Sequence, residues 1–194
     1  MEKPIIVLCG PSGVGKTTIK NHLIDNYDVL FPVCYTTRAP RNDDNGDYAY
    51  LSQEEFKDYE EKDLFFMSSG SIDKYGFIRQ DYGSPIIITT SYKNTLRLLQ
   101  RESNVIVIEL AYTNIIEEMK NRFESRNNDE LLYKKRIRHD IEDHEKYFEE
   151  VKKVSSLVIY TDLYSIDEVN NIIEDHLIKL GIISKKSGLL LRKD

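Results

Sequence analysis

The sequence predicts an α/β fold in which a parallel sheet is covered by helices on both faces. Short apolar runs bounded by turn residues recur along the chain, and such runs are typical of strands buried on both faces. Stretches in which apolar residues follow helical spacing separate and follow these runs. Because strands that alternate with helices indicate parallel pairing, we expect one sheet with helices on each side.

The expected elements follow one another along the chain. The first apolar run, Ile5 to Leu8, lies between Pro4 and Gly10. Three further runs are expected to form strands, at residues 85–90, 105–110 and 157–161. The clearest helix runs from Ile166 to Leu180, where apolar residues recur on one face of a 3.6-residue period.

Two segments break this rhythm. The segment from about 36 to 83 contains turn chemistry at residues 42–46 and short aromatic-rich runs, which indicates an insertion. In the second segment, Lys120 to Arg138, seven of nineteen residues are Lys or Arg, and a helix, a loop and a second helix are expected there. Residues after Ser184 are expected to form a tail.

Composition limits the classes of function. With 194 residues the chain is expected to form a single domain, residues 1–194. The formal net charge of −6 argues against nucleic acid or an anionic membrane as a partner. No apolar run approaches the ~20 residues of a membrane span, and the start of the chain does not have the pattern of a signal peptide, so we expect a cytoplasmic protein. The oligomeric state, monomer or homodimer, stays open.

A phosphate-binding motif follows the first expected strand. Residues 10–17 read G-P-S-G-V-G-K-T, which fits G-x-x-x-x-G-K-[ST] between a strand and a helix. In such a P-loop, successive backbone N–H groups and the start of the helix hold phosphate oxygens. Lys16 is expected to contact the β- and γ-phosphates of ATP, and the Thr17 hydroxyl to bind Mg²⁺. The residues expected to bind ATP are Gly10, Ser12, Gly13, Val14, Gly15, Lys16, Thr17 and Thr18.

A second phosphate site is expected at residues 35–50. Arg38 and Arg41 lie three residues apart in an extended segment restrained by Pro40, which suits a two-pronged contact with a phosphate. Tyr48, in the stretch N-G-D-Y, could add a hydroxyl donor to the same anion. Two separate phosphate sites predict a donor and an acceptor.

From residue 5 to about 180 the chain resembles the guanylate kinase family. The resemblance joins the P-loop to the T-T-R-x-P-R and N-G-x-D-Y stretches, the Tyr75-Gly76 pair and an arginine-rich segment. It implies a P-loop NTPase three-layer fold with a five-stranded parallel core, about 1–35 and 84–194. It also implies a subdomain that binds the nucleoside monophosphate at about 36–83 and a lid at about 121–138. Members transfer the γ-phosphate of ATP to GMP, with Mg²⁺.

The resemblance also implies roles for single residues. Arg38, Arg41, Tyr48 and Tyr75 match positions that bind the phosphate of the acceptor. In the lid, three arginines match residues that contact the phosphates during transfer, and with Lys16 they form the expected catalytic set. These are Arg122, Arg126 and Arg136.

The positions with which the family reads guanine are altered. Phe66 stands where a glutamate is usual, Cys34 where a serine is usual, and Ile88 and Thr90 where two aspartates are usual. Cys34, Phe66 and Thr90 are still expected to line the acceptor site. Two readings stay open: a guanylate kinase with other base contacts, or a kinase for another phosphorylated acceptor such as ribose 1,5-bisphosphate.

Two further interpretations also stay open. Some guanylate-kinase-like domains are non-catalytic binding modules, although the intact P-loop favours an enzyme. Glu109, near the end of the expected strand at 105–110, is expected to be a surface or helix-capping acid, with a place near the metal as the alternative.

Overall fold

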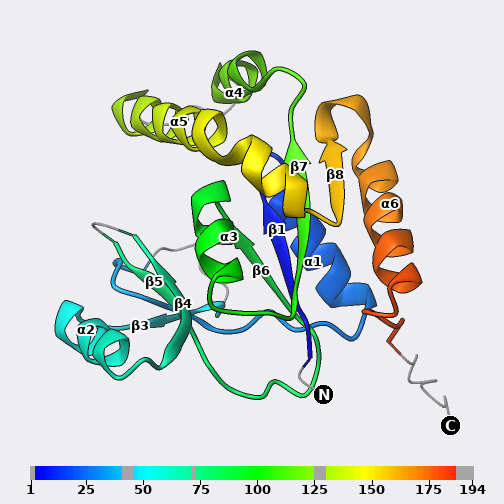
Figure 1. The fold of residues 1–194 in the computed structure, drawn as a ribbon. Coiled ribbons are helices and arrows are strands. Elements are labelled where there is room, and N and C mark those ends of the chain that lie inside the picture. The colour runs from blue at the N-terminus through cyan, green and yellow to red at the C-terminus, as the bar shows by residue number, and fades with distance from the viewer. Residues whose placement is uncertain (1–2, 41–45, 71–72, 125–129, 187–194) are drawn as a thin grey trace, which may run out of the picture.

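The computed structural model describes residues 3–40, 46–70, 73–124 and 130–186, and for 122–124 and 130–136 it describes the backbone alone. The described chain forms two sheets and the helices around them (Figure 1). In chain order the elements are β1 (Ile5–Cys9), α1 (Lys16–Asn26), β2 (Cys34–Thr36), β3 (Tyr48–Tyr50), α2 (Gln53–Glu61), β4 (Phe65–Ser69), β5 (Tyr75–Ile78), β6 (Ile86–Thr90), α3 (Tyr92–Leu99), β7 (Val105–Ala111), α4 (Ile115–Glu124), α5 (Glu130–Val154), β8 (Leu157–Tyr160), the short 3₁₀ helix η1 (Thr161–Leu163) and α6 (Ile166–Lys179).

The larger sheet confirms the predicted fold class. Its strand order is β6-β1-β7-β8, and every neighbouring pair is parallel. The four strands are those that the apolar runs predicted, and α6 coincides with the expected helix from Ile166. In the central strand Cys9 pairs with Thr90 on β6 and with Glu109 on β7. The ends of β1 and β6 therefore lie side by side at one edge of the sheet, and β7 continues two residues beyond Glu109.

Helices cover both faces of this sheet, which explains why β1 is apolar throughout. Ile6 and Leu8 pack into the hydrophobic cluster that includes residues of α1 and α6. Val7 and Cys9 point to the opposite face, where the cluster includes residues of α3 and α5. Successive side chains of a strand alternate between its faces, so all five residues of β1 are buried. The helices α3 and α5 thus lie across the sheet from α1 and α6 (Figure 1).

The expected fifth strand is reduced to one residue in the described chain. Leu30 forms an isolated parallel bridge with Ile86, donating to the carbonyl of Pro85 and accepting from the N–H of Ile87. Pro32 follows two residues later and has no N–H to donate, so the pairing does not continue as a strand. Four strands and a single bridge therefore stand where five strands were expected.

The second sheet is built from residues between Cys34 and Ile78 and has the order β3-β2-β5-β4. Its pairs are antiparallel except for β2 with β3. One face packs on α2, where the rings of Phe56 and Phe65 lie 4.7 Å apart. Gly76 lies against the same ring: a Cβ there would lie 2.8 Å from Phe65 carbon atoms. The other face joins the core cluster under α3 through Cys34, Phe77 and their neighbours.

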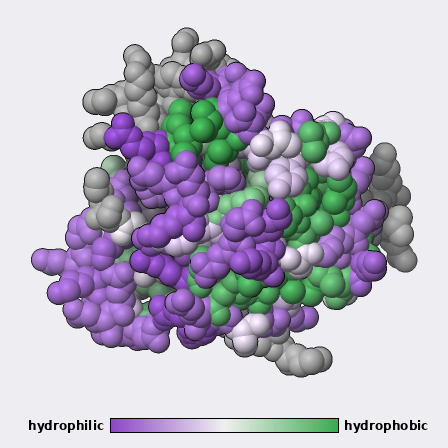
Figure 2. All heavy atoms as spheres, turned by 45° about the horizontal axis from the view of Figure 1, so that its top comes forward, coloured by the Kyte–Doolittle hydropathy of each residue, from purple (hydrophilic) through white to green (hydrophobic). Residues whose placement is uncertain are grey.

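The molecular surface mixes hydrophilic side chains with smaller apolar patches (Figure 2). Among the exposed apolar residues are Leu163, Tyr164 and Ile166, which are 61%, 46% and 45% exposed around η1 and the start of α6. Within residues 3–40, 46–70, 73–124 and 130–186, none of the helices combines the length and the apolar character that crossing a membrane requires.

Candidate nucleotide-binding site

The P-loop connects β1 to α1 as the motif predicts. Gly10 has φ of 144°, and a Cβ at this position would lie 2.1 Å from the carbonyl oxygen of Leu110, so glycine is required. Gly15, with φ of 102°, is the residue before α1, and it has no side chain to cap the helix. The first turn of α1 also carries no acidic residue. The positive end of the helix is therefore not neutralised from within its first turn.

Lys16 is folded back onto the loop. Its Nζ donates hydrogen bonds to the carbonyl oxygens of Gly10 and Pro11, at 2.7 and 2.8 Å. Burial lowers the pKa of Lys16 from 10.5 to about 8, and the nearby carboxylates of Asp140 and Asp143 oppose that shift. The Lys16 ammonium therefore lies in a partly dehydrated place, where a phosphate would stabilise its charge.

A cavity of about 430 Å³ opens beside the P-loop. One wall is formed by residues 13–19, which include the expected ATP-binding residues from Gly13 to Thr18. The other wall comes from the segment around η1 and the start of α6, with Thr161, Tyr164, Ile166 and Val169. A loop of backbone N–H groups beside a partly apolar wall suits a ligand that carries both phosphates and a flat apolar group.

The chemistry of this cavity suits a metal that arrives with phosphates. Thr17 supplies a hydroxyl oxygen, a hard ligand of the type that Mg²⁺ accepts. Over the described part of the chain there is no group of three or more His, Cys, Asp or Glu side chains that could hold a metal ion. Mg²⁺ commonly keeps several waters and is held by one or two protein groups together with substrate phosphates, so a single Thr hydroxyl fits such a use.

The second sheet brings several expected acceptor residues onto one face. Cys34 on β2 lies opposite Tyr48 on β3 and Phe77 on β5. Tyr75 lies opposite Thr36 on β2, two residues along, and residues two apart in a strand share a face. Because directly paired residues also point to the same side, Cys34, Tyr48 and Tyr75 share the face that packs toward the core sheet. Burial raises the pKa of the Cys34 thiol to about 12.

Arg38 is held beside this face. It is 6% exposed, and its guanidinium carbon lies 4.4 Å from the centre of the Tyr48 ring. Its Nη1 also donates to the carbonyl of Ala39 at 3.0 Å. The structure therefore brings Arg38 and Tyr48 together, and their contact with a phosphate stays a prediction. Arg41, the other expected prong, lies outside the described residues.

An ion pair that sequence reasoning missed joins α1 to the segment that is expected to bind the acceptor. Lys20 Nζ lies 2.9 Å from Asp47 Oδ2 and 3.8 Å from the centre of the Phe31 ring. The Lys20 side chain is 7% exposed. Lys20 lies one helical turn after Lys16, so the signal in the sequence was a second lysine on the same helix face. The pair anchors the helix of the P-loop beside Tyr48, the residue after Asp47.

The last residue of β6 is the expected acceptor residue Thr90. It is 9% exposed and pairs with Cys9, the residue before the P-loop, so it lies at the strand edge beside the donor loop. Ile88, two residues earlier, is fully buried in the cluster beneath α3. The position where the family has a base-reading carboxylate is thus apolar core in this chain.

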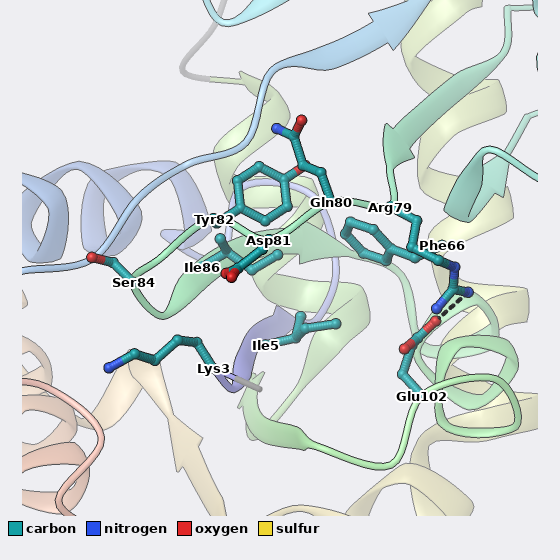
Figure 3. A pocket seen from close by; sticks show the side chains of 10 residues that line it. All are labelled: Lys3, Ile5, Phe66, Arg79, Gln80, Asp81, Tyr82, Ser84, Ile86 and Glu102. Carbon is teal, nitrogen blue, oxygen red and sulfur yellow. Dashed lines mark ion pairs between the residues drawn. The ribbon is translucent and has the colours of Figure 1, made fainter. Parts of the chain in front are cut away.

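Phe66 belongs to the same hydrophobic cluster as Cys34 but also borders the opposite edge of the core sheet. Its ring stacks on Phe77 at 5.9 Å between ring centres. It also lines a cavity of about 480 Å³, which adjoins Ile5 and Ile86 at the first residues of β1 and β6 (Figure 3). That edge of the core sheet is opposite to the edge that carries the P-loop. At one end of the cavity Arg79 and Glu102 form an ion pair of 2.6 Å (Figure 3).

The arginines expected in the lid fall where side chains are not described. Arg126 lies outside the described residues, and for Arg122 in α4 and Arg136 in α5 the structure gives the backbone alone. The two expected helices are matched by α4 and α5, and the expected loop between them falls at residues 125–129, outside the described residues. The roles of the three arginines stay predictions.

Glu109 is neither a surface acid nor a helix cap, contrary to the sequence expectation. It is 0% exposed, and Ser155 Oγ donates to its Oε2 at 3.2 Å. Burial raises its pKa from 4.5 to about 7. The expectation was wrong because the residue lies within β7, where its side chain points between the sheet and α5 rather than out of the strand edge.

Taken together, the parallel sheet, the glycine-rich loop at the start of α1 and the lysine inside that loop define a P-loop nucleotide-binding protein of the α/β class. The guanylate kinase family model matches residues 1–181. The chain therefore belongs to the guanylate kinase family.

Individual relatives support this membership. Over 124 residues the chain is 36% identical to a guanylate kinase of Malacoplasma penetrans, covering 61% of this chain and 57% of that protein. Over 121 residues it is 30% identical to a guanylate kinase of Thermotoga maritima, covering 57% and 58%. The chain thus spans less than two thirds of the curated relatives it matches. The crystal structure of guanylate kinase from Anaplasma phagocytophilum has a similar fold, with a TM-score of 0.69 over 92% of this chain and 86% of that chain at 20% identity.

Proposed function

We propose that this protein is an ATP-dependent phosphotransferase that transfers the γ-phosphate of ATP to GMP, giving ADP and GDP. The observation that carries the proposal is the link between the two expected phosphate sites: the Lys20–Asp47 ion pair joins the helix of the P-loop to the sheet with Arg38 and Tyr48. Membership of the guanylate kinase family and the names of its relatives support the same activity.

Each part of the chain has a place in this proposal. The core at about 1–35 and 84–194 binds ATP, the insertion at about 36–83 binds the nucleoside monophosphate, and the segment at about 121–138 serves as the lid. The cavity beside the P-loop, with Tyr164 and Ile166 on its apolar wall, would hold the adenosine part of ATP. Arg38, Arg41, Tyr48 and Tyr75 would hold the phosphate of the acceptor.

The chemistry needs positioning and positive charge more than covalent help. Phosphoryl transfer passes through a loose transition state, so an enzyme accelerates it by aligning the two substrates and neutralising their charges. Lys16 would contact the β- and γ-phosphates, while Thr17 holds Mg²⁺. Bound Mg²⁺ supplies charge neutralisation at the donor phosphates. Arg122, Arg126 and Arg136 would neutralise the group in transfer, and exclusion of water from the site would suppress hydrolysis of ATP.

The base of the acceptor would contact a face of the second sheet that is more apolar than the family pattern. Cys34, Met67 and Phe77 are all buried there, and Ile88 lies in the same cluster. An N–H group of guanine left without an acceptor is disfavoured by about 1–3 kcal/mol, so some polar group must meet the base. Ser69 is the best candidate, because it pairs with Tyr75 and shares its face. Ser68 points the other way and donates to Glu60 of α2 at 3.0 Å.

The apolar face also favours one second candidate, an acceptor other than a nucleotide, such as ribose 1,5-bisphosphate. Such an acceptor keeps the need for a phosphate fork and has no base to read. A sugar phosphate would leave Phe77 and Met67 packed as they are in the structure. The rates at which the protein phosphorylates GMP and ribose 1,5-bisphosphate would distinguish the two proposals.

A coupled assay of ADP formation across acceptors tests the proposal. GMP, dGMP, AMP, CMP, UMP and ribose 1,5-bisphosphate are each supplied with Mg·ATP, and we expect GMP to give the highest kcat/KM. Lys16→Ala should abolish turnover, whereas Lys179→Ala, an exposed lysine on α6, should not change it. Selective turnover of ribose 1,5-bisphosphate would replace the first proposal with the second, and a folded protein that turns over no acceptor would contradict both.

A further inference from the structure

Two groups of the P-loop that are expected to bind phosphate instead donate hydrogen bonds to other groups of the protein. The backbone N–H of Ser12 donates a hydrogen bond of 2.9 Å to Oδ2 of Asp140, a residue 128 positions away on α5. Lys16 Nζ donates to the carbonyls of Gly10 and Pro11. A carboxylate and a phosphate present the same kind of acceptor, a negatively charged oxygen, to a backbone N–H. Asp140 therefore holds a donor that an ATP phosphate oxygen could use.

The fold holds Asp140 in this position through the next turn of α5. Asp143, three residues later, accepts hydrogen bonds from the backbone N–H groups of Tyr92 and Lys93, at 2.8 and 3.3 Å. These are the first two residues of α3, whose preceding residue, Ser91, makes no capping bond with its own side chain. Asp143 thus caps α3 from outside and fixes α5 against the core. Because α5 is fixed in this way, the Asp140 carboxylate lies within hydrogen-bond distance of the Ser12 N–H.

The charge of Asp140 acts on the same loop. The carboxylate side chain is 16% exposed, so water screens it only in part. It raises the pKa of the Lys16 ammonium and so stabilises the charge that burial disfavours. The side chain therefore offers both the hydrogen bond and the negative charge that a bound phosphate would bring. Two negative groups cannot share that place without repulsion.

We propose that Asp140 is an internal competitor for the donor site: its carboxylate holds the Ser12 amide, and ATP binds by displacing it. This inference rests on the proposed function, because it assumes that ATP is the donor. Asp140 would then weaken ATP binding without contacting the acceptor. Breaking a charge-assisted hydrogen bond opposes binding, and its removal should tighten binding about threefold to tenfold.

Titration calorimetry with matched variants tests the proposal. ADP and a non-hydrolysable ATP analogue are titrated, each with Mg²⁺ and without acceptor, into the wild type, Asp140→Asn, Asp140→Ala and Glu142→Gln. Asp140→Asn keeps an oxygen acceptor and removes the charge, Asp140→Ala removes both, and Glu142→Gln removes the same charge from an exposed position of α5. Both Asp140 variants should bind at least threefold more tightly than the wild type, and Glu142→Gln should bind within twofold of it. Thermal unfolding of each variant verifies that it is folded.

The Ser12 amide provides a second, direct readout by ¹H–¹⁵N NMR. Asp140→Ala should move the Ser12 amide resonance of the ligand-free protein, and saturating ADP should bring the wild type and the variant to nearly the same position. Unchanged or weaker nucleotide binding in both Asp140 variants overturns the proposal, as does an unmoved Ser12 resonance. A wild type that binds neither nucleotide overturns the proposed function as well, whereas tight wild-type binding that the variants leave unchanged overturns this inference alone.

Discussion

Glu109 is a carboxylate in the centre of the core, and its ionisation should limit the stability of the protein. It lies on β7 opposite Cys9 and is 0% exposed. Oε2 accepts the hydrogen bond from Ser155, whereas Oε1 is buried and has no hydrogen-bond partner among the described residues. Burial raises the pKa of Glu109 to about 7, although Ser155 and Lys152 lower it. In the unfolded chain the same group has its ordinary pKa of 4.5.

The sign of the effect follows from proton binding. Between pH 4.5 and about 7, the folded protein keeps a proton on Glu109 that the unfolded chain has released. The stability that this proton contributes is present below pH 4.5 and is lost as the pH rises through about 7. Because each pH unit corresponds to about 1.4 kcal/mol, the loss from pH 5 to pH 8 should be about 2.5 kcal/mol.

Urea unfolding of the wild type and of Glu109→Gln at pH 5, 6, 7 and 8 measures this loss. Gln has nearly the same shape and does not titrate, so the free energy of unfolding of the variant minus that of the wild type should rise by about 2.5 kcal/mol over this range. The comparison across pH cancels any constant effect of the new amide. Glu145→Gln, at an exposed position of α5, serves as the control. A difference that stays constant within about 0.5 kcal/mol from pH 5 to pH 8 would refute the reasoning.

Three further predictions concern contacts that hold the two sheets and α3 in place. Asp143→Ala removes the cap of α3 and should lower the free energy of unfolding by about 1–2 kcal/mol in urea, with unchanged stability as the contradicting result. Gly76→Ala would place a Cβ 2.8 Å from the ring of Phe65 and should lower stability by about 1–3 kcal/mol; Phe65→Leu in the same chain should recover part of the loss, and no recovery would argue against the contact. Lys20→Met removes the buried ion pair with Asp47 and should lower stability by about 2 kcal/mol. A double-mutant cycle with Asp47→Asn should show coupling above about 0.5 kcal/mol, and additive effects would contradict it.

The core strands were predictable because their signal is local. A strand covered on both faces is apolar at most positions, so β1, β6, β7 and β8 appear as largely apolar runs. The three-residue strands β2 and β3 have no such run, and their pairing depends on partners far along the chain. The fifth strand is limited to one bridge for a local reason that the sequence contains, namely Pro32, two residues after Leu30.

The candidate site also has a part that the local sequence predicts and a part that depends on contacts between distant residues. The P-loop is a contiguous motif whose glycines are required by its own backbone, as Gly10 shows. The contacts of Lys20 with Asp47 and of Ser12 with Asp140 join residues 27 and 128 positions apart, and no local pattern identifies the distant partner in either contact. The prediction that Glu109 is a surface or capping acid was wrong because a single acid in an apolar run was taken to mark the exposed end of the strand. Its burial follows from the helix α5 that covers it, which is a tertiary feature.

The placement of two carboxylates near the P-loop determines how the proposed donor site would admit a nucleotide. A net charge of −6 would repel nucleotides if it acted uniformly, but the groups next to the P-loop determine the local potential. There Asp140 and Asp143 act on the Lys16 ammonium from one face of α5. Asp143 accepts from two N–H groups of α3 and cannot move without uncapping that helix, whereas Asp140 accepts from one N–H of an exposed loop residue and lies 3.8 Å from Nδ1 of the exposed His139. Displacement by a phosphate should therefore begin at Asp140, and Asp143 should continue to stabilise the ammonium of Lys16 when nucleotide binds.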